Sequence, residues 1–400
     1  MESKMTYNSR DAVPTPAYIV EEEALIHNLE VLQQVEAATG CKILLAQKCF
    51  SMFYEYPLIG RYISGCTASG LYEARLGSEE MGGENHVFSP AYRDGEFDEI
   101  VSYCDHISFN SLSQLAKYGN RTGGKSFGLR INPECSTQGD HAIYDPCAPG
   151  SRLGTSVGKL IAAAGGSGEV LDEAMAQTLM EGVLQGVEGL HFHTLCEQLV
   201  EPLEETLAAV EAKFGPLLSH MKWLNMGGGH HITAEGYDVK CLIALIQRIQ
   251  NTYGVTVYLE PGEAVALNAG VLKTTVLDVV EQDGITTLIL DASAACHMPD
   301  VLEMPYRPPL QNSGMPGEKA YTYRLSSYTC LAGDVIGDYS FDVEVGIGDV
   351  LYFEDMAIYS MVKNNTFNGI GLPLIVAQHT DGSCEVVRSF GYEDFKMRLS

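Results

Sequence analysis

The sequence carries little positive charge for its length. Its 400 residues include 25 Lys and Arg against 52 Asp and Glu, so the formal net charge is −27. Such a chain repels nucleic acid and anionic membrane surfaces, which argues against both as partners. The same charge suits a cationic small molecule, although acidity that serves only solubility is the simpler interpretation.

Features of membrane and secreted proteins are also missing. No run of about twenty apolar residues occurs, which argues against a membrane-spanning helix, and the N-terminal segment MESKMTYNSRDAVP lacks the apolar core of a secretory signal. The eleven cysteines form no CxxC pairs, which favours reduced thiols over disulfides. With 46% hydrophobic residues, the chain is expected to be a cytoplasmic enzyme of about two domains.

The first two-thirds of the sequence alternates between predicted strands and predicted helices. Residues 14–20 predict a strand, followed by an amphipathic helix that buries Leu25, Leu29, Leu32 and Val35 and ends at Gly40. Short apolar runs then alternate with helical patterns at 42–48, 65–70 (the weakest), 86–90, 106–111, 126–133, 189–195, 223–229 and 255–261. Repeated strand-then-helix units predict a parallel sheet, and this many predict a closed (β/α)8 barrel.

Beyond residue 265 the apolar residues alternate on a period of two between Gly and Asp turns, which predicts an antiparallel β domain. We therefore expect a barrel over residues 35–264 and a barrel-like β domain built from residues 1–34 and 265–400. The segment 134–181 is expected to be a loop with a helical or mobile excursion.

Three features at expected strand ends indicate a pyridoxal phosphate site. In YLEPGE, Glu260 ends a buried strand, where a carboxylate is costly unless a basic group such as a pyridinium nitrogen meets it. The glycines 227–229 allow close approach of an anion such as phosphate, expected at a helix start. Lys48 closes an apolar run, and burial would make it nucleophilic enough to bind an aldehyde. The active site of a barrel lies at these strand ends, where Arg130 and His193 also fall.

A metal site is the competing interpretation of one segment. His191 and His193 stand two apart on an expected strand, so both face one side, and Cys196 follows. Paired histidines of this kind bind metal in some hydrolases, but no convincing set of further ligands accompanies them. We therefore expect no metal, and a packed core histidine is the alternative for either residue.

Longer motifs make a family resemblance specific. They are AQKCF (46–50), SRLG (151–154), HFHTLCE (191–197), NMGGGHH (225–231), EPGE (260–263), ACHMPDVLEMPYRP (295–308), YTCLAGD (328–334) and EDMAIYSMVKNNTFNG (354–369). From about residue 14 onward the chain resembles the carboxynorspermidine/carboxyspermidine decarboxylases, which belong to the alanine-racemase-like, fold-type III pyridoxal phosphate enzymes. The block 295–308 and the EPGE variant point to this polyamine branch.

The resemblance implies a role for each matching residue. Pyridoxal phosphate would be held by Lys48, Arg152, His193, Gly228, Gly229, Glu260 and Tyr359, with Lys48 bonded to its aldehyde and His193 stacked on its ring. Catalysis would involve Lys48, His193 and Cys330, with the Cys330 thiol as proton donor to Cα. Substrate would meet Glu263, His297, Asp300 and Asp334. Cys330 and Asp334 would reach in from the second subunit of a head-to-tail homodimer.

The implied substrate is a cationic carboxylated triamine. Carboxynorspermidine and carboxyspermidine differ by one methylene, worth only about 1–3 kcal/mol in a pocket, so the sequence does not choose between them. Decarboxylation of ornithine, arginine or diaminopimelate is the alternative reaction, and a non-catalytic pyridoxal phosphate carrier is an alternative of another class. Ornithine and diaminopimelate relatives carry arginine after EPG where this chain has Glu263. That carboxylate would turn elsewhere or meet a substrate ammonium.

Overall fold

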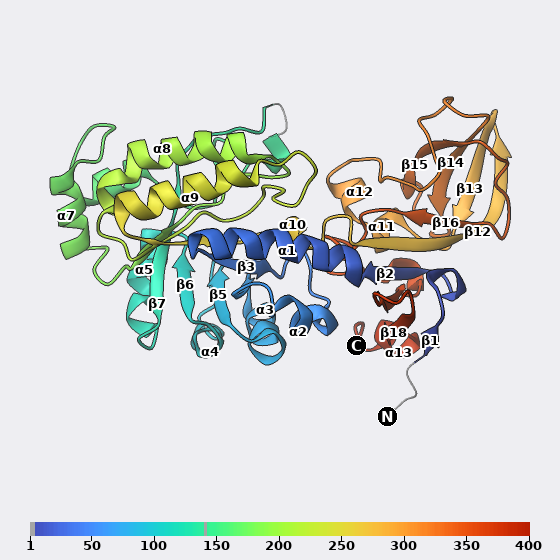
Figure 1. Cartoon of the computed structure of the whole chain (residues 1–400), viewed down its shortest axis with the longest axis horizontal. Coiled ribbons are helices and arrows are strands. Elements are labelled where there is room, and N and C mark those ends of the chain that lie inside the picture. The colour runs from blue at the N-terminus through green and yellow to red at the C-terminus, as the bar shows by residue number, and fades with distance from the viewer. Residues whose placement is uncertain (1–4, 140–141) are drawn as a thin grey trace. The chain divides into compact units, whose positions relative to one another are not determined.

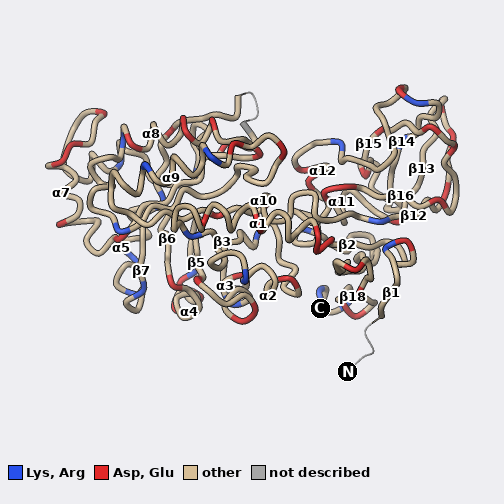
Figure 2. The backbone as a smooth tube through the Cα atoms, in the orientation of Figure 1, with Lys and Arg blue, Asp and Glu red and all other residues tan. Residues whose placement is uncertain are grey.

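The computed structural model describes residues 5–139 and 142–400. The chain divides into two compact units, Asn28–Val265 and Met1–His27 with Ala266–Ser400 (Figure 1). Figure 2 shows acidic residues distributed along the backbone of both units rather than gathered in one block. None of the described helices is long and apolar enough to cross a membrane.

The first unit is a closed barrel of eight parallel strands. These are β3 (Lys42–Ala46), β4 (Gly65–Ala68), β5 (Glu84–Phe88), β6 (His106–Phe109), β7 (Ser126–Asn132), β9 (Gly189–His191), β10 (Trp223–Asn225) and β11 (Thr256–Leu259). Each pairs in parallel with its neighbours, and β11 pairs with β3 to close the ring. The predicted barrel is confirmed, including the weak strand at 65–70. A short ninth strand, β8 (Thr155–Ser156), adds to β7.

The helices of the barrel begin and end where local chemistry dictates. In α9 (Val239–Tyr253) the Asp238 side chain caps the first turn and Gly254, with φ +69°, ends the last. In α1 (Glu22–Thr39) the four predicted apolar residues are fully buried, and Gly40 follows with φ +70°. The remaining helices are α2 (Tyr56–Ile59), α3 (Leu71–Leu76), α4 (Phe97–Tyr103), α5 (Leu112–Tyr118), α6 (Val157–Ala163), α7 (Glu173–Glu181), α8 (Val200–Leu218) and α10 (Glu263–Ala266). The 134–181 segment thus holds a helical excursion, α6 and α7.

Close packing inside the barrel explains two glycines. The Trp223 ring lies where side chains from Gly128 and Gly189 would stand: a Cβ on either residue would come within 2.3 Å or 1.9 Å of the ring. Leu44 and Tyr258 pack beside Trp223 in the same apolar cluster. Above and below this cluster the barrel interior is polar.

The second unit is a mixed sheet rather than a purely antiparallel one. Its strands are β1 (Thr6–Tyr7), β2 (Ala17–Glu21), β12 (Gly270–Gln282), β13 (Ile285–Leu290), β14 (Tyr321–Ser327), β15 (Val335–Phe341), β16 (Val350–Phe353), β17 (Leu374–Gln378) and β18 (Cys384–Arg388), with helices α11 (Ala294–His297), α12 (Asp300–Glu303) and α13 (Tyr392–Lys396). The order is β1-β18-β17-β2-β12-β13-β14-β15, with β16 also on β12. The pairs β2–β17 and β13–β14 are parallel. The antiparallel prediction fails at these two pairs, because a period of two marks a strand without fixing the direction of its neighbour.

Candidate active site

The carboxyl ends of the barrel strands bring the predicted residues of the first unit to one mouth. Glu260 directly follows β11, Lys48 lies two residues beyond β3, and His193 lies two residues beyond β9. Glycines 227–229 begin two residues after β10. Because the strands are parallel and closed into a ring, all these ends share one rim.

Glu260 is a buried, ionised carboxylate. Its side chain is 10% exposed, and its Oε1 accepts a hydrogen bond of 2.7 Å from the amide of Asn225. Burial acts to raise the pKa of Glu260, but the nearby His191 imidazole and the Asn225 hydrogen bond outweigh it and hold that pKa below its ordinary value. His191 Nε2 lies 3.4 Å from Oε2 without the geometry of a hydrogen bond. Oε2 therefore keeps the capacity to accept a further N–H.

The two histidines beside Glu260 are neutral. Burial lowers the pKa of His191 to about 4, and burial together with the charge of Lys48 lowers that of His193 well below its ordinary value. His193 Nδ1 accepts a hydrogen bond of 3.0 Å from the Gly228 amide, so its proton sits on Nε2. His193 is thus fixed in one tautomer and orientation.

The glycine loop differs from the expectation of a helix start. The next helix, α9, begins only at Val239, and the Gly228 amide is already bonded to His193. Glycine is needed because the loop is squeezed between backbones: a Cβ on Gly228 would lie 2.1 Å from the Glu260 carbonyl oxygen, and one on Gly229 would lie 1.9 Å from that of Leu195. Gly228 therefore positions His193, and contact of Gly228 and Gly229 with a phosphate stays a prediction.

Three side chains at this mouth were not assigned a role from the sequence. Asn225, as described, and the hydroxyl of Thr67 both donate to Glu260. Arg130 is buried, donates to the His193 carbonyl at 3.1 Å and lies 4.4 Å from the Phe88 ring centroid. Each lies on a strand near its carboxyl end, which is the signal that singled out Arg130 in the sequence and could also have found Asn225 and Thr67. Arg152 and Lys48 are exposed, so the expected burial of Lys48 is wrong, because its side chain extends past the end of β3. The charge of Arg152 acts on Arg130.

Glu263 has a partner inside the barrel unit. Its Oε2 lies 2.6 Å from His231 Nε2, with side chains 12% and 18% exposed. A second hydrogen bond joins the same two segments, because the Thr233 hydroxyl donates to the Ala264 carbonyl at 2.7 Å. The carboxylate that replaces the relatives' arginine is therefore turned to a histidine of the glycine loop.

The remaining predicted residues lie in the second unit, and most are engaged there. The Asp334 carboxylate accepts hydrogen bonds from Ser293, Ser327 and Thr329 hydroxyls and from the Ala295 amide. His297 bonds to the Ser293 amide and to the Gly371 carbonyl. Asp300 pairs with Lys363. The Cys330 amide donates to the Asn368 side chain.

These contacts favour structural roles for two of the predicted substrate ligands. Asp334 and His297 are fully buried, and both ring nitrogens of His297 are bonded. Their contact with substrate stays a prediction. Cys330, by contrast, is exposed, and Tyr359 is half-buried in a left-handed backbone conformation with φ +46°.

The arrangement fits pyridoxal phosphate and not the alternative metal. Glu260 presents a buried anionic oxygen, and both His191 nitrogens are buried without a hydrogen bond, so these polar groups keep the capacity to bind a ligand. His193 Nδ1 is occupied by an amide. Among the described residues, the one cluster of ligand atoms close enough for a metal lies elsewhere, at Glu84, His86 and His106.

Comparisons with known proteins agree with this site. Residues 17–357 match the family described as pyridoxal-dependent decarboxylase, C-terminal sheet domain. The carboxynorspermidine/carboxyspermidine decarboxylase of Campylobacter jejuni is 41% identical over 399 residues, 97% of this chain and 99% of that protein. The carboxyaminopropylagmatine decarboxylase of Synechocystis is 40% identical over 392 residues, 97% of this chain and 96% of that protein.

A solved structure extends the likeness to the fold. The crystal structure of carboxynorspermidine decarboxylase from Campylobacter jejuni, complexed with norspermidine, matches with a TM-score of 0.85 at 41% identity, covering 96% of this chain and 100% of that chain. The predicted resemblance, enzyme class and cofactor are confirmed. The chain belongs to the family of pyridoxal-dependent decarboxylases.

Proposed function

We propose that this chain removes the carboxylate of carboxynorspermidine or carboxyspermidine as CO2, leaving norspermidine or spermidine. The observation that carries the proposal is the near-complete, 41% identical match to a relative of that name, whose decarboxylase structure holds norspermidine. The acidic surface supports a polycationic substrate, since opposite charge speeds encounter. A cytoplasmic location is part of the proposal and is supported by eleven free thiols.

The residues of the barrel mouth would serve this reaction in distinct ways. The bound cofactor supplies an electron sink for the bond between Cα and the carboxylate. Glu260 would hold a proton on the pyridine nitrogen, His193 would lie against the ring, and Lys48 would anchor the aldehyde. Cys330 would then deliver a proton to Cα.

Completion of the site would require two copies of the chain. We place Cys330 of one protomer at the Lys48 pocket of its partner in a head-to-tail homodimer, as the resemblance implies. Asp334, which the resemblance also places there, is buried and bonded within its own unit and would support the Cys330 segment. The exposure of Cys330 supports this, because a proton donor must be accessible to the substrate.

Measured CO2 release from a panel of substrates tests the proposal. The panel contains carboxynorspermidine, carboxyspermidine and carboxyaminopropylagmatine, with diaminopimelate, ornithine and arginine as comparisons. We expect kcat/KM to be highest for one of the first two. A preference for carboxyaminopropylagmatine would assign the activity of the Synechocystis relative, and a preference for an unmodified amino acid would overturn the proposal. Cofactor binding without CO2 release from any substrate would indicate a carrier.

A further inference from the structure

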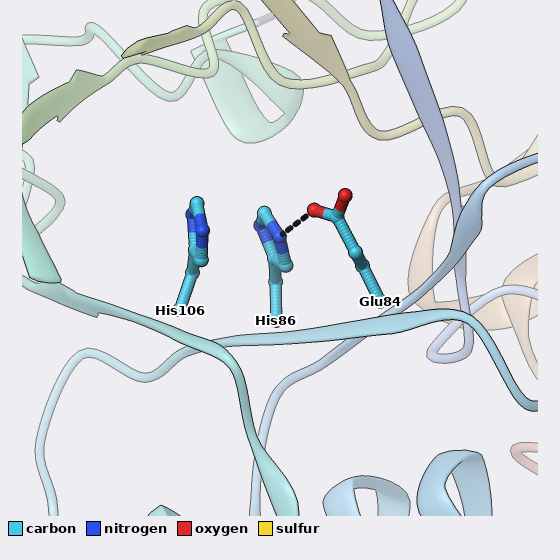
Figure 3. Close-up of side chains that lie close together, drawn as sticks. All are labelled: Glu84, His86 and His106. Carbon is cyan, nitrogen blue, oxygen red and sulfur yellow. Dashed lines mark hydrogen bonds and ion pairs between the residues drawn. The ribbon is translucent and has the colours of Figure 1, made fainter. Parts of the chain in front are cut away.

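A cluster of two histidines and a glutamate lies at the opposite end of the barrel from the proposed active site. Glu84 and His86 stand two apart on β5, so both face the barrel interior. His106, the first residue of β6, pairs directly with His86 across the two parallel strands. Ligand atoms of the three residues all lie within 4.8 Å of one another (Figure 3). The mechanism proposed above uses none of them.

One imidazole of this cluster has a buried nitrogen without a hydrogen bond. His86 Nε2 lies 3.2 Å from a Glu84 carboxylate oxygen, which fixes that ring. His106 Nδ1 is buried, and no partner for it exists among the described residues. Buried polar atoms are nearly always satisfied, and an exception points to a missing water or ion.

We propose that Glu84, His86 and His106 bind a divalent first-row transition metal ion such as Zn²⁺. Imidazole nitrogen together with carboxylate oxygen is a donor set that suits zinc, cobalt and nickel. Three protein ligands leave a fourth position for water, so the site is of the open type. The sequence did not predict it, because the ligands come from two strands.

Binding requires one ring to turn. The two imidazoles are stacked, with centroids 4.1 Å apart and planes at 18°, as Figure 3 shows. Lone pairs of imidazole lie in the ring plane, so stacked rings do not converge on one ion. His106 Nδ1 makes no hydrogen bond that would have to break as this ring turns toward His86 and Glu84, whereas the His86 ring is held by Glu84.

The groups around the cluster leave its ligand atoms unprotonated. Burial and the neighbouring His86 lower the pKa of His106 to about 4, which keeps its ring nitrogen unprotonated for an ion, and the carboxylates of Glu84, Asp105 and Glu188 act in the opposite direction. Each of these carboxylates also has a lysine partner: Lys42 for Glu84, Lys125 for Asp105 and Lys222 for Glu188. Lys42 Nζ lies 3.5 Å from Glu84 Oε1, and its side chain is 42% exposed and can turn into solvent. The Tyr258 hydroxyl hydrogen-bonds to Glu84 and would orient the carboxylate toward the ion.

The single tryptophan of the chain reports on this site. Trp223 is the only tryptophan, and its ring centroid lies 5.2 Å from that of His106. Untagged holoenzyme, stripped with chelator, would be titrated with Co²⁺ and then Ni²⁺ while Trp223 fluorescence is recorded, and metal content would be measured after dialysis against Zn²⁺. We expect one ion per chain and saturable quenching with a single binding curve.

Matched variants separate this site from adventitious binding. Glu84→Gln and His106→Gln should each weaken Co²⁺ binding by more than about a hundredfold. Loss of a group that only supports a ligand costs about 10- to 100-fold, so a larger loss indicates a direct ligand. His220→Gln, which alters a histidine 3.5 Å from Glu173 near the surface, should bind like wild type. Circular dichroism and cofactor absorbance would establish that each variant is folded.

Two results would overturn the proposal. One is holoenzyme that retains no zinc and shows no saturable quenching, which would leave a water as the partner of His106. The other is equal Co²⁺ affinity in wild type, Glu84→Gln and His106→Gln, which would place the ion on other groups such as thiols. Neither result bears on the decarboxylase activity proposed above.

Discussion

Replacing Glu260 by glutamine tests the proposed electrostatic centre of the site. The change is isosteric, and the amide oxygen of glutamine can still accept the hydrogen bond from Asn225, so the local structure should persist. The substitution removes the buried negative charge of the Glu260 carboxylate. Glutamine cannot hold a proton on a facing base as a carboxylate does, so the ring nitrogen should become harder to protonate.

The size of the effect follows from the burial of Glu260. Opposite unit charges about 4 Å apart attract by about 4 kcal/mol at an effective dielectric constant near 20, against about 1 kcal/mol in bulk water. The difference of about 3 kcal/mol corresponds to roughly a hundredfold in an equilibrium constant. We therefore expect Glu260→Gln to retain cofactor and to lower kcat by about two orders of magnitude.

Absorbance would quantify bound cofactor, and CO2 release would give kcat in the same preparation. Glu188→Gln is a suitable control, because it removes a carboxylate that pairs with exposed Lys222 and lies 33% exposed. An exposed pair of this kind contributes at most about 1 kcal/mol, so that variant should keep wild-type kcat. A Glu260→Gln protein with full cofactor and a kcat within threefold of wild type, roughly 0.6 kcal/mol, would refute the assigned role.

Three further outcomes are expected. Borohydride reduction followed by peptide mapping should place the cofactor on Lys48, and recovery on a different lysine would reject that assignment. Gly228→Ala should lower stability by about 1–3 kcal/mol in denaturant unfolding, because its Cβ would stand 2.1 Å from the Glu260 carbonyl oxygen; Gly158→Ala, in a helix with open space around it, should be neutral or slightly stabilising. Mixing inactive Lys48→Ala and Cys330→Ala proteins should restore about a quarter of wild-type activity by random exchange in a two-fold dimer, and demonstrated exchange without recovery would exclude a shared site.

Much of the barrel could be predicted from the sequence because each strand is a short apolar run that ends on a polar or glycine residue. Lys48 and Glu260 follow such runs, and parallel strands that close into a ring must place their carboxyl ends together. The direction of β17 against β2 could not be predicted in this way, since alternation marks a strand and not its neighbour. The contacts of individual groups were equally hidden. The Gly228 amide donates to His193, and Glu263 faces His231. Both contacts depend on how closely the glycine loop approaches neighbouring segments, which the sequence does not specify.

The polar interior below Trp223 shows what sequence patterns miss in a barrel. An inward-facing histidine in an apolar strand is read as a packed core residue when it is considered alone. Strand register brings two such histidines together, because His86 pairs directly with His106 although they lie twenty positions apart in the sequence. A buried imidazole nitrogen without a hydrogen bond destabilises a fold, yet here it lies beside a second imidazole and a carboxylate. Candidate ligand sites in a (β/α)8 barrel are therefore best sought by comparing inward positions of neighbouring strands at the same register, at both ends of the barrel.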